Sequence, residues 1–153
     1  MSKAKLRTEL LSDPLGVGYS GMSDQECANS LNAQTRSKTV AISSAELLAW
    51  SGAGATETIK SRYERIEDAA ADHVSLAVKG ACKAAIKLIE RDSTMLDLSL
   101  ADREAMVDAL VAGSVLTADE KAELVALGTE SISRAQELGI GKVLPGYVMK
   151  ARA

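Results

Sequence analysis

Helix-start signals recur along this chain and constrain its fold more than any other feature of the sequence. Residues 23–26 (Ser-Asp-Gln-Glu) have the pattern of a capping box, in which the serine hydroxyl and the glutamate carboxylate satisfy free backbone N–H groups at a helix start. The pattern recurs at residues 43–46 and 117–120, and Ser99 with Asp102 makes a weaker version. The sequence therefore predicts an all-α fold.

The predicted architecture is a helical bundle of about three main helices with a turn-rich N-terminal arm of short helices. The arm is expected to comprise residues 1–54 and the bundle residues 55–153, because the helices lengthen after residue 55. Abundant alanine and the absence of phenylalanine favour closely packed helices. The predicted helices span residues 3–12, 23–33, 44–51, 56–91, 99–112, 118–138 and 145–152, and the strand signals are nearly confined to 39–42 and 142–144.

The helix predicted for residues 56–91 is the longest, with a candidate break near Gly80. Apolar side chains recur along it at helical spacing, which is typical of a buried stripe. The stripe consists of Ile66, Ala70, Val74, Ala77, Ala81, Ala85 and Leu88. In the helix predicted for 118–138, Gly128 is expected to allow close contact with another helix.

The charge balance argues against a dedicated nucleic-acid-binding domain, because such domains are normally basic. The formal net charge is −3 and the sequence pI is about 5.3. Basic residues nevertheless gather near both ends of the chain, where they either contact an acidic partner or serve solubility. They are Lys3, Lys5 and Arg7 at one end, and Lys142, Lys150 and Arg152 at the other.

Two cysteines, Cys27 and Cys82, each lie among apolar neighbours on a predicted helix. Two buried free thiols are therefore favoured over a disulfide. The charged N-terminus does not resemble a secretory signal, and no apolar run approaches the length of a membrane span. We expect the chain to be made and folded in a cytoplasm, without a membrane partner.

The segment of residues 16–21 matches the pattern G-x-G-x-x-G, which can mark a dinucleotide-binding turn. That turn should follow a buried strand, whereas residues 5–12 are predicted to be helical and Asp13-Pro14 ends that helix. The acidic residue expected about 20 positions later is also missing. We interpret the glycines as a tight link between two helices.

Catalytic groups are scarce in this sequence. His73 is the only histidine, which excludes a site with several histidine ligands, and it is interpreted as a helix-face or partly buried residue. Neither cysteine has the local signature of an activated nucleophile. The chain is expected not to be an enzyme and to use no cofactor and no metal.

Two groups of residues are candidates for protein contacts. Glu64, Asp68 and Asp72 are spaced by four residues and form one acidic line, which is either a solvated face, a docking surface for another subunit's Lys or Arg, or half of a Mg²⁺ or Ca²⁺ site. Tyr19 and Tyr147 lie in expected loops, where they serve either as interface anchors or as caps of their own core.

Both ends of the chain resemble small, mostly uncharacterised proteins of tailed bacteriophages. Residues 13–24 match the pattern D-P-L-x-x-G-Y-x-G-M-[ST]-D, and Ala28, Leu31 and Asn32 match the A-x-x-L-N that follows. Residues 133–141 (SRAQELGIG) with Val143, Pro145-Gly146, Val148 and Ala151-Arg152-Ala153 are similar to the C-terminal part of that group. The sequence departs from the pattern at residues 34–38 (QTRSK), where the group often carries arginine and asparagine.

The resemblance implies a phage origin, with synthesis in the host cytoplasm and, by association, a place in the virion. The expected function is a non-enzymatic structural or assembly protein that contacts other phage structural proteins or copies of itself, with nucleic acid an unlikely partner. Its expected contact residues are Leu15, Tyr19, Met22, Tyr147 and Val148. Two alternatives are a phage-encoded modulator that docks on a host cytoplasmic protein through Glu64, Asp68 and Asp72, and a nucleotide- or phosphate-binding enzyme that uses the glycine loop.

Overall fold

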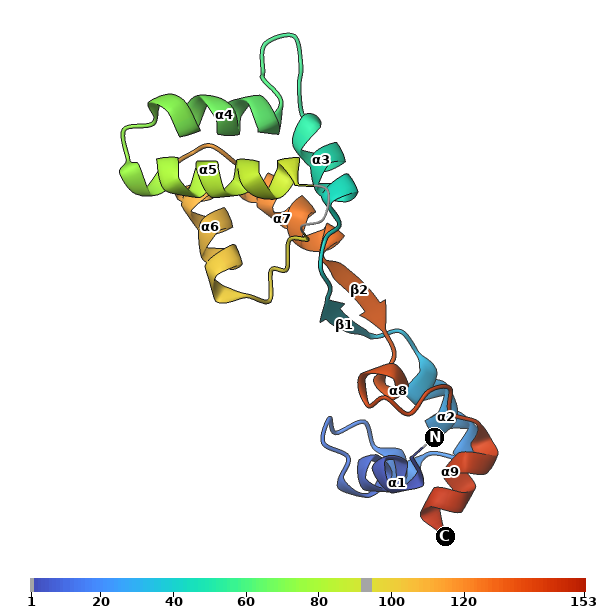
Figure 1. Cartoon of the computed structure of the whole chain (residues 1–153). Coiled ribbons are helices and arrows are strands. Elements are labelled where there is room, and N and C mark those ends of the chain that lie inside the picture. Colours follow the sequence, from blue (N-terminus) through green and yellow to red (C-terminus); the bar gives the residue numbers. More distant parts are fainter. Residues whose placement is uncertain (1, 92–94) are drawn as a thin grey trace. The chain divides into compact units, whose positions relative to one another are not determined.

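The computed structural model describes residues 2–91 and 95–153, and this part of the chain is mostly helical (Figure 1). The chain forms two compact units. Unit 1 combines Met1–Lys38 with Ser131–Ala153, and unit 2 consists of Thr39–Glu130. This division differs from the expected boundary near residues 53–55, because the last segment packs against the first one instead of joining the bundle.

Unit 1 is built from both ends of the chain. Its elements are α1 (Lys3–Ser12), the 3-10 turn η1 (Tyr19–Gly21), α2 (Asp24–Asn32), α8 (Arg134–Glu137) and α9 (Pro145–Arg152). Helix α9 packs against both α1 and α2. The buried core takes side chains from both segments: Leu6, Leu10, Tyr19, Cys27, Ala28 and Leu31 from the first, and Ala135, Ile140, Val143, Val148 and Ala151 from the last.

Strands β1 (Arg36–Thr39) and β2 (Thr129–Ile132) pair with each other, and each contains one of the points at which the chain passes between the units. Strand β2 corrects the helix predicted for residues 118–138. Helix α7 (Ala118–Leu127) ends at Gly128, whose added Cβ would lie 3.3 Å from the Ile42 side chain and from the Val40 carbonyl oxygen. This glycine therefore allows close contact with an extended segment and not with a helix.

Unit 2 is a helical unit in which α5 is central. Its helices are α3 (Ser44–Gly52), α4 (Arg62–Asp72), α5 (Leu76–Glu90), α6 (Ala101–Ala112) and α7. Helix α5 lies beside α4 and also packs against α3 and α6 (Figure 1). The expectation of about three main helices is thus wrong for this unit, which has five in its described residues.

The helix predicted for residues 56–91 is interrupted at residues 73–75. The Nδ1 atom of His73 accepts a hydrogen bond from the Ser75 N–H at 3.0 Å, and its Nε2 lies 3.1 Å from the Gly113 carbonyl oxygen. Ser75 then caps α5, which continues unbroken through Gly80. The interruption changes the helical phase, so Val74 is 98% exposed and not part of the predicted buried stripe.

The exposed Ala77 is likewise outside the stripe, whereas Ile66, Ala70, Ala85 and Leu88 are buried as predicted.

The capping boxes predicted at Ser23, Ser43 and Thr117 are confirmed. The weaker one at Ser99 is wrong, because Ser99 binds Asp97 and α6 starts after Leu100 without a side-chain cap. Two further boxes occur, at residues 61–64 and 133–136.

Gly113→Ala tests the close approach of α6 to α5. A Cβ at Gly113 would lie 2.7 Å from Cγ1 of Val78, which is buried and stiff because it is β-branched. We expect the substitution to lower the free energy of unfolding by about 1–3 kcal/mol, as overpacking does. Urea denaturation measures this. The matched control, Gly80→Ala, has open space around the new Cβ and should not destabilise the protein.

Candidate interaction surfaces

The glycine-rich loop holds its own anion. The Asp13 carboxylate accepts hydrogen bonds from the backbone N–H groups of Val17 at 2.8 Å and Gly18 at 2.7 Å. Gly16 and Gly18 adopt positive φ angles of 64° and 85°, which glycine tolerates without strain. The loop thus binds an aspartate of the same chain with the backbone N–H groups that a phosphate-binding turn would offer to a phosphate.

Arg152 fixes the turn that follows this loop. Its Nη2 donates to the Tyr19 carbonyl oxygen at 2.6 Å and to the Met22 carbonyl oxygen at 2.9 Å, and its Nη1 donates to Asp24 at 2.7 Å. The same Nη2 lies 3.0 Å from the Cys27 sulfur. Arg152 thus joins the last segment of the chain to the first one. The first segment is therefore part of a packed unit and not a separate arm.

The five expected contact residues divide into surface and core. Leu15 and Tyr147 are exposed, at 42% and 38%, and Met22 is partly buried against the unit 1 core. Tyr19 and Val148 are buried at 1% and 0%, which corrects the expectation that they form contacts. Both side chains fill the small core of unit 1. The chain contains no phenylalanine that could take this place.

Two polar contacts between the ends of the chain escaped prediction from the sequence. The Asn32 side chain exchanges hydrogen bonds of 2.7 and 2.9 Å with the backbone of Val143. The buried Glu9 accepts two hydrogen bonds from Arg134, at 2.8 and 2.7 Å. These bonds to Glu9, together with one to Glu137, raise the pKa of Arg134 further above its already high ordinary value.

The predicted acidic line is partly used within the chain. Glu64 caps α4 by binding Ser61, and Asp68 forms an exposed ion pair with Lys60 at 2.6 Å. No hydrogen bond or ion pair is found for Asp72 within the described residues, and it is exposed at the end of α4. Within residues 2–91 and 95–153, no three His, Cys, Asp or Glu side chains lie together so as to hold a metal ion.

Charge is segregated between the two units. Unit 1 has nine Lys and Arg against five Asp and Glu, a net charge of +4, whereas unit 2 has nine against sixteen, a net charge of −7. All five carboxylates of unit 1 bind groups within that unit. Five of its exposed cations have no such partner among the described residues: Lys3, Arg7, Lys38, Lys142 and Lys150. Unit 1 therefore presents uncompensated positive charge.

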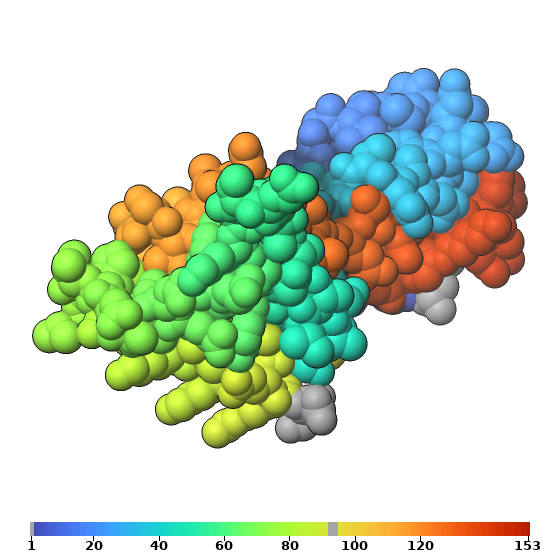
Figure 2. Space-filling view, turned by 90° about the horizontal axis from the view of Figure 1, so that it is seen from above, coloured from blue at the N-terminus to red at the C-terminus, as the bar shows by residue number. Residues whose placement is uncertain are grey.

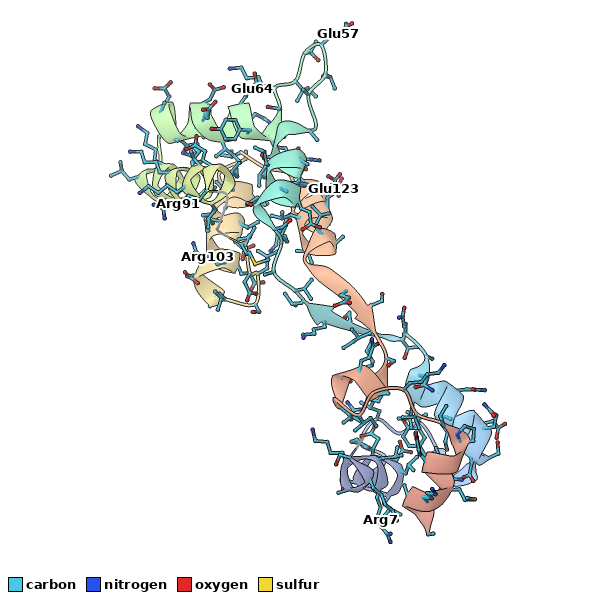
Figure 3. All side chains as sticks on the ribbon, turned by 45° about the vertical axis from the view of Figure 1, so that its right-hand side comes forward. Arg7, Glu57, Glu64, Arg91, Arg103 and Glu123 are labelled. Carbon is cyan, nitrogen blue, oxygen red and sulfur yellow. The ribbon has the colours of Figure 1, made fainter. Side chains whose placement is uncertain are left out.

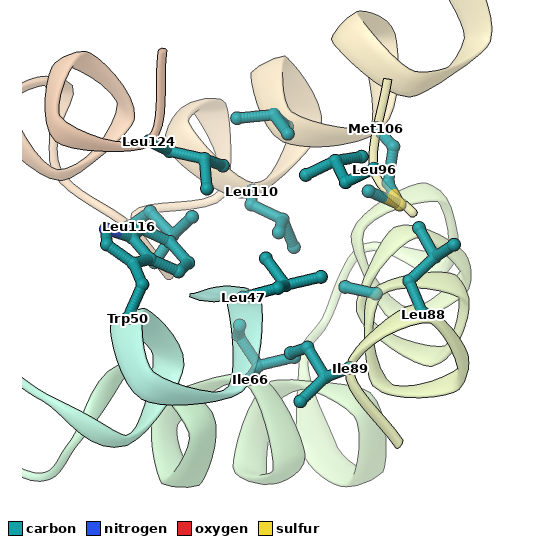
Figure 4. Close-up of a pocket in the computed structure, with 12 residues that line it drawn as sticks. Leu47, Trp50, Ile66, Leu88, Ile89, Leu96, Met106, Leu110, Leu116 and Leu124 are labelled. Atoms are coloured by element: carbon teal, nitrogen blue, oxygen red, sulfur yellow. The ribbon is translucent and has the colours of Figure 1, made fainter. Parts of the chain in front are cut away.

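One space in the apolar core of unit 2 is too small for a ligand. The space bounded by Leu47, Trp50, Leu110 and their apolar neighbours measures about 20 Å³ (Figure 4). That volume is close to the minimum that a single water molecule needs. We interpret it as a packing void of the core.

An ionic network joins α4 to the start of α7. Arg62 stacks on the Trp50 ring at 4.9 Å and binds Glu120 and Glu123, while Arg65 also binds Glu120. Burial alone would raise the pKa of Glu120, but hydrogen bonds from Arg65 and from the Thr117 N–H outweigh it and lower the pKa below its ordinary value. The network thus stabilises the charged carboxylate.

The Glu120 contacts predict a pH dependence of stability. A lowered pKa in the folded state means that this stabilisation is fully present above the unfolded pKa of about 4.3 and is lost as the pH falls through the folded value. Glu120→Gln should lower the free energy of unfolding by about 1–2 kcal/mol at pH 7, with the difference shrinking below about pH 4. Urea denaturation of both proteins across this pH range measures it. A difference that does not change with pH would contradict the assignment.

Searches against family models, curated proteins and solved structures find no match to this chain. Among the helices of the described residues, none combines the length and the apolar character that crossing a bilayer requires. Both described cysteines are free and buried, as predicted.

Proposed function

We propose that this chain is a non-enzymatic structural or assembly protein of a tailed bacteriophage, made in the host cytoplasm and acting through contacts with other phage proteins or with copies of itself. One observation carries the proposal. The residues that resemble phage proteins lie at opposite ends of the sequence, yet they build unit 1 together through Asn32, Arg134, Val143, Val148 and Arg152. Their contacts account for the fold of unit 1.

The surroundings of the reactive side chains support this reading. Both ring nitrogens of His73 bind backbone groups, and burial raises the pKa of the Cys27 and Cys82 thiols. The backbone N–H groups of the glycine loop bind Asp13. Large apolar side chains are also exposed on both units, where contacts with other proteins would cover them.

Mass spectrometry of purified virions tests the proposal. We expect peptides of this chain at a copy number comparable to that of known minor structural proteins, and extra density for it by electron microscopy. Particles that are intact and infectious but lack the chain would overturn the proposal.

A further inference from the structure

The three most exposed large apolar side chains lie beside charged residues, which are positive on unit 1 and negative on unit 2. Val74 is 98% exposed, Leu76 83% and Leu11 69%, against 58% or less for every other large apolar residue of the described chain. Leu11 belongs to the basic unit 1, and Val74 and Leu76 belong to the acidic unit 2. Covering apolar groups exposed to this degree is favourable, because it removes apolar surface from water.

On unit 1, Leu11 continues a line of cations. Lys3, Arg7 and Leu11 are spaced by four residues on α1, so they lie along one side of that helix. They are exposed, since α1 buries Leu6, Glu9 and Leu10, and Arg7 extends away from the helix into solvent (Figure 3). We call Lys3, Arg7 and Leu11 the basic stripe.

On unit 2, Val74 and Leu76 follow a line of carboxylates. Asp68 and Asp72 are one turn apart on α4. Val74 lies in the connection that follows, and Leu76 is the first residue of α5. This connection lies at the edge of unit 2 (Figure 2). Asp68 forms an ion pair with Lys60, but both side chains are about 60% exposed, so they can exchange partners. We call Asp68, Asp72, Val74 and Leu76 the acidic tip.

The terminal charges of these two surfaces oppose the stability of their own helices. Lys3 stands at the positive N-terminal end of α1, and Asp72 stands at the negative C-terminal end of α4. A helix dipole favours the reverse placement at both positions. Neither charge therefore stabilises its own helix.

We infer that the basic stripe of one copy binds the acidic tip of another copy of this chain. The two surfaces carry opposite charges beside exposed apolar side chains: Lys3 and Arg7 beside Leu11 on one, and Asp68 and Asp72 beside Val74 and Leu76 on the other. Contact covers the exposed apolar side chains and brings Lys3 and Arg7 close to Asp68 and Asp72. The inference rests on the proposed function, namely action through protein contacts, and names the partner of these two surfaces.

When one basic stripe binds one acidic tip, the single contact is heterologous and leaves a free surface at each end of the pair. Further copies then add head to tail, and the assembly either closes into a ring or grows as a filament. A contact of about two helical turns per copy is smaller than a standard interface of roughly 800 Å² per partner. Each single contact is therefore weak and depends on salt.

Sedimentation velocity of the purified full chain tests the inference. The wild-type chain should associate beyond a dimer as its concentration rises toward about 1 mM, and salt between about 0.05 and 0.5 M should weaken that association. Lys3→Glu/Arg7→Glu and Asp72→Lys/Val74→Ser should each weaken it at least about tenfold. Both pairs place charges that suit the helix dipoles, so melting temperatures should not fall.

A matched control and a mixing experiment make the test specific. Lys83→Glu/Lys87→Glu changes the charge by the same amount as Lys3→Glu/Arg7→Glu, on exposed positions of α5 outside both surfaces, and should associate like the wild type. The two interface variants, each impaired alone, should form a 1:1 heterodimer when mixed, because each retains one intact surface.

A wild-type chain that stays monomeric, a control variant that is impaired equally, or a mixture that does not associate would overturn the inference. A monomeric chain that is present in virions would overturn this inference alone. An associating chain that is absent from virions would overturn only the proposed function.

Discussion

Val148→Asp is expected to unfold unit 1. Val148 is fully buried in α9, within a core shared by both ends of the chain. A carboxyl group there would be taken out of water among apolar side chains, at a cost comparable to the roughly 5–15 kcal/mol that holds a domain together. We expect loss of the cooperative transition of unit 1 in chemical denaturation, with the helical signal of unit 2 retained.

The neighbouring residue supplies the control. Tyr147 is exposed, so Tyr147→Asp should change the free energy of unfolding by no more than about 0.5 kcal/mol. If the two substitutions had similar effects, the assignment of Val148 to the core and Tyr147 to the surface would be wrong.

Arg134→Ala is expected to lower the stability of unit 1 by about 3–5 kcal/mol. Two nitrogens of Arg134 donate hydrogen bonds to the Glu9 carboxylate, and Glu9 is only 3% exposed. Removing the guanidinium leaves that carboxylate buried without its partner, which costs more than the net contribution of the pair. Urea denaturation followed by circular dichroism measures the change.

Two further variants separate this effect from a general loss of charge. Arg36→Ala removes an exposed partner of Glu137 and should cost less than about 1 kcal/mol. Glu9→Leu combined with Arg134→Ala should recover much of the stability, because no unpaired charge then remains. A double variant as unstable as Arg134→Ala alone would contradict this explanation.

Local signals in the sequence predicted the helices well. The capping boxes that begin at Ser23, Ser43 and Thr117 are satisfied by groups three residues away, so the sequence contains the whole interaction. The break at His73 was missed because its partner, Gly113, lies 40 residues further along the chain. The predicted buried stripe assumed one continuous helix, so its apolar periodicity placed Val74 in the core, whereas the break leaves Val74 exposed.

The sequence did not predict that unit 1 combines the two ends of the chain, for the same physical reason. The pairs Asn32–Val143 and Glu9–Arg134 join residues 111 and 125 positions apart, and no local pattern indicates such a contact. Tyr19 was expected on the surface because glycines surround it, yet the loop turns its ring inward. Of the candidate contact surfaces, the sequence predicted the acidic line from its four-residue spacing. The exposed leucines beside charged residues could not be predicted, because their exposure depends on the tertiary structure.

The two ends of the chain form one folding unit into which residues 39–130 are inserted. The Val40 N–H donates to the Gly128 carbonyl oxygen at 2.9 Å, so the two crossings lie close enough to be joined directly. Replacing residues 41–127 by Asn-Gly would turn β1 and β2 into a hairpin. We predict dispersed amide resonances and a cooperative unfolding transition for this shortened chain. A collapsed spectrum without such a transition would contradict the claim.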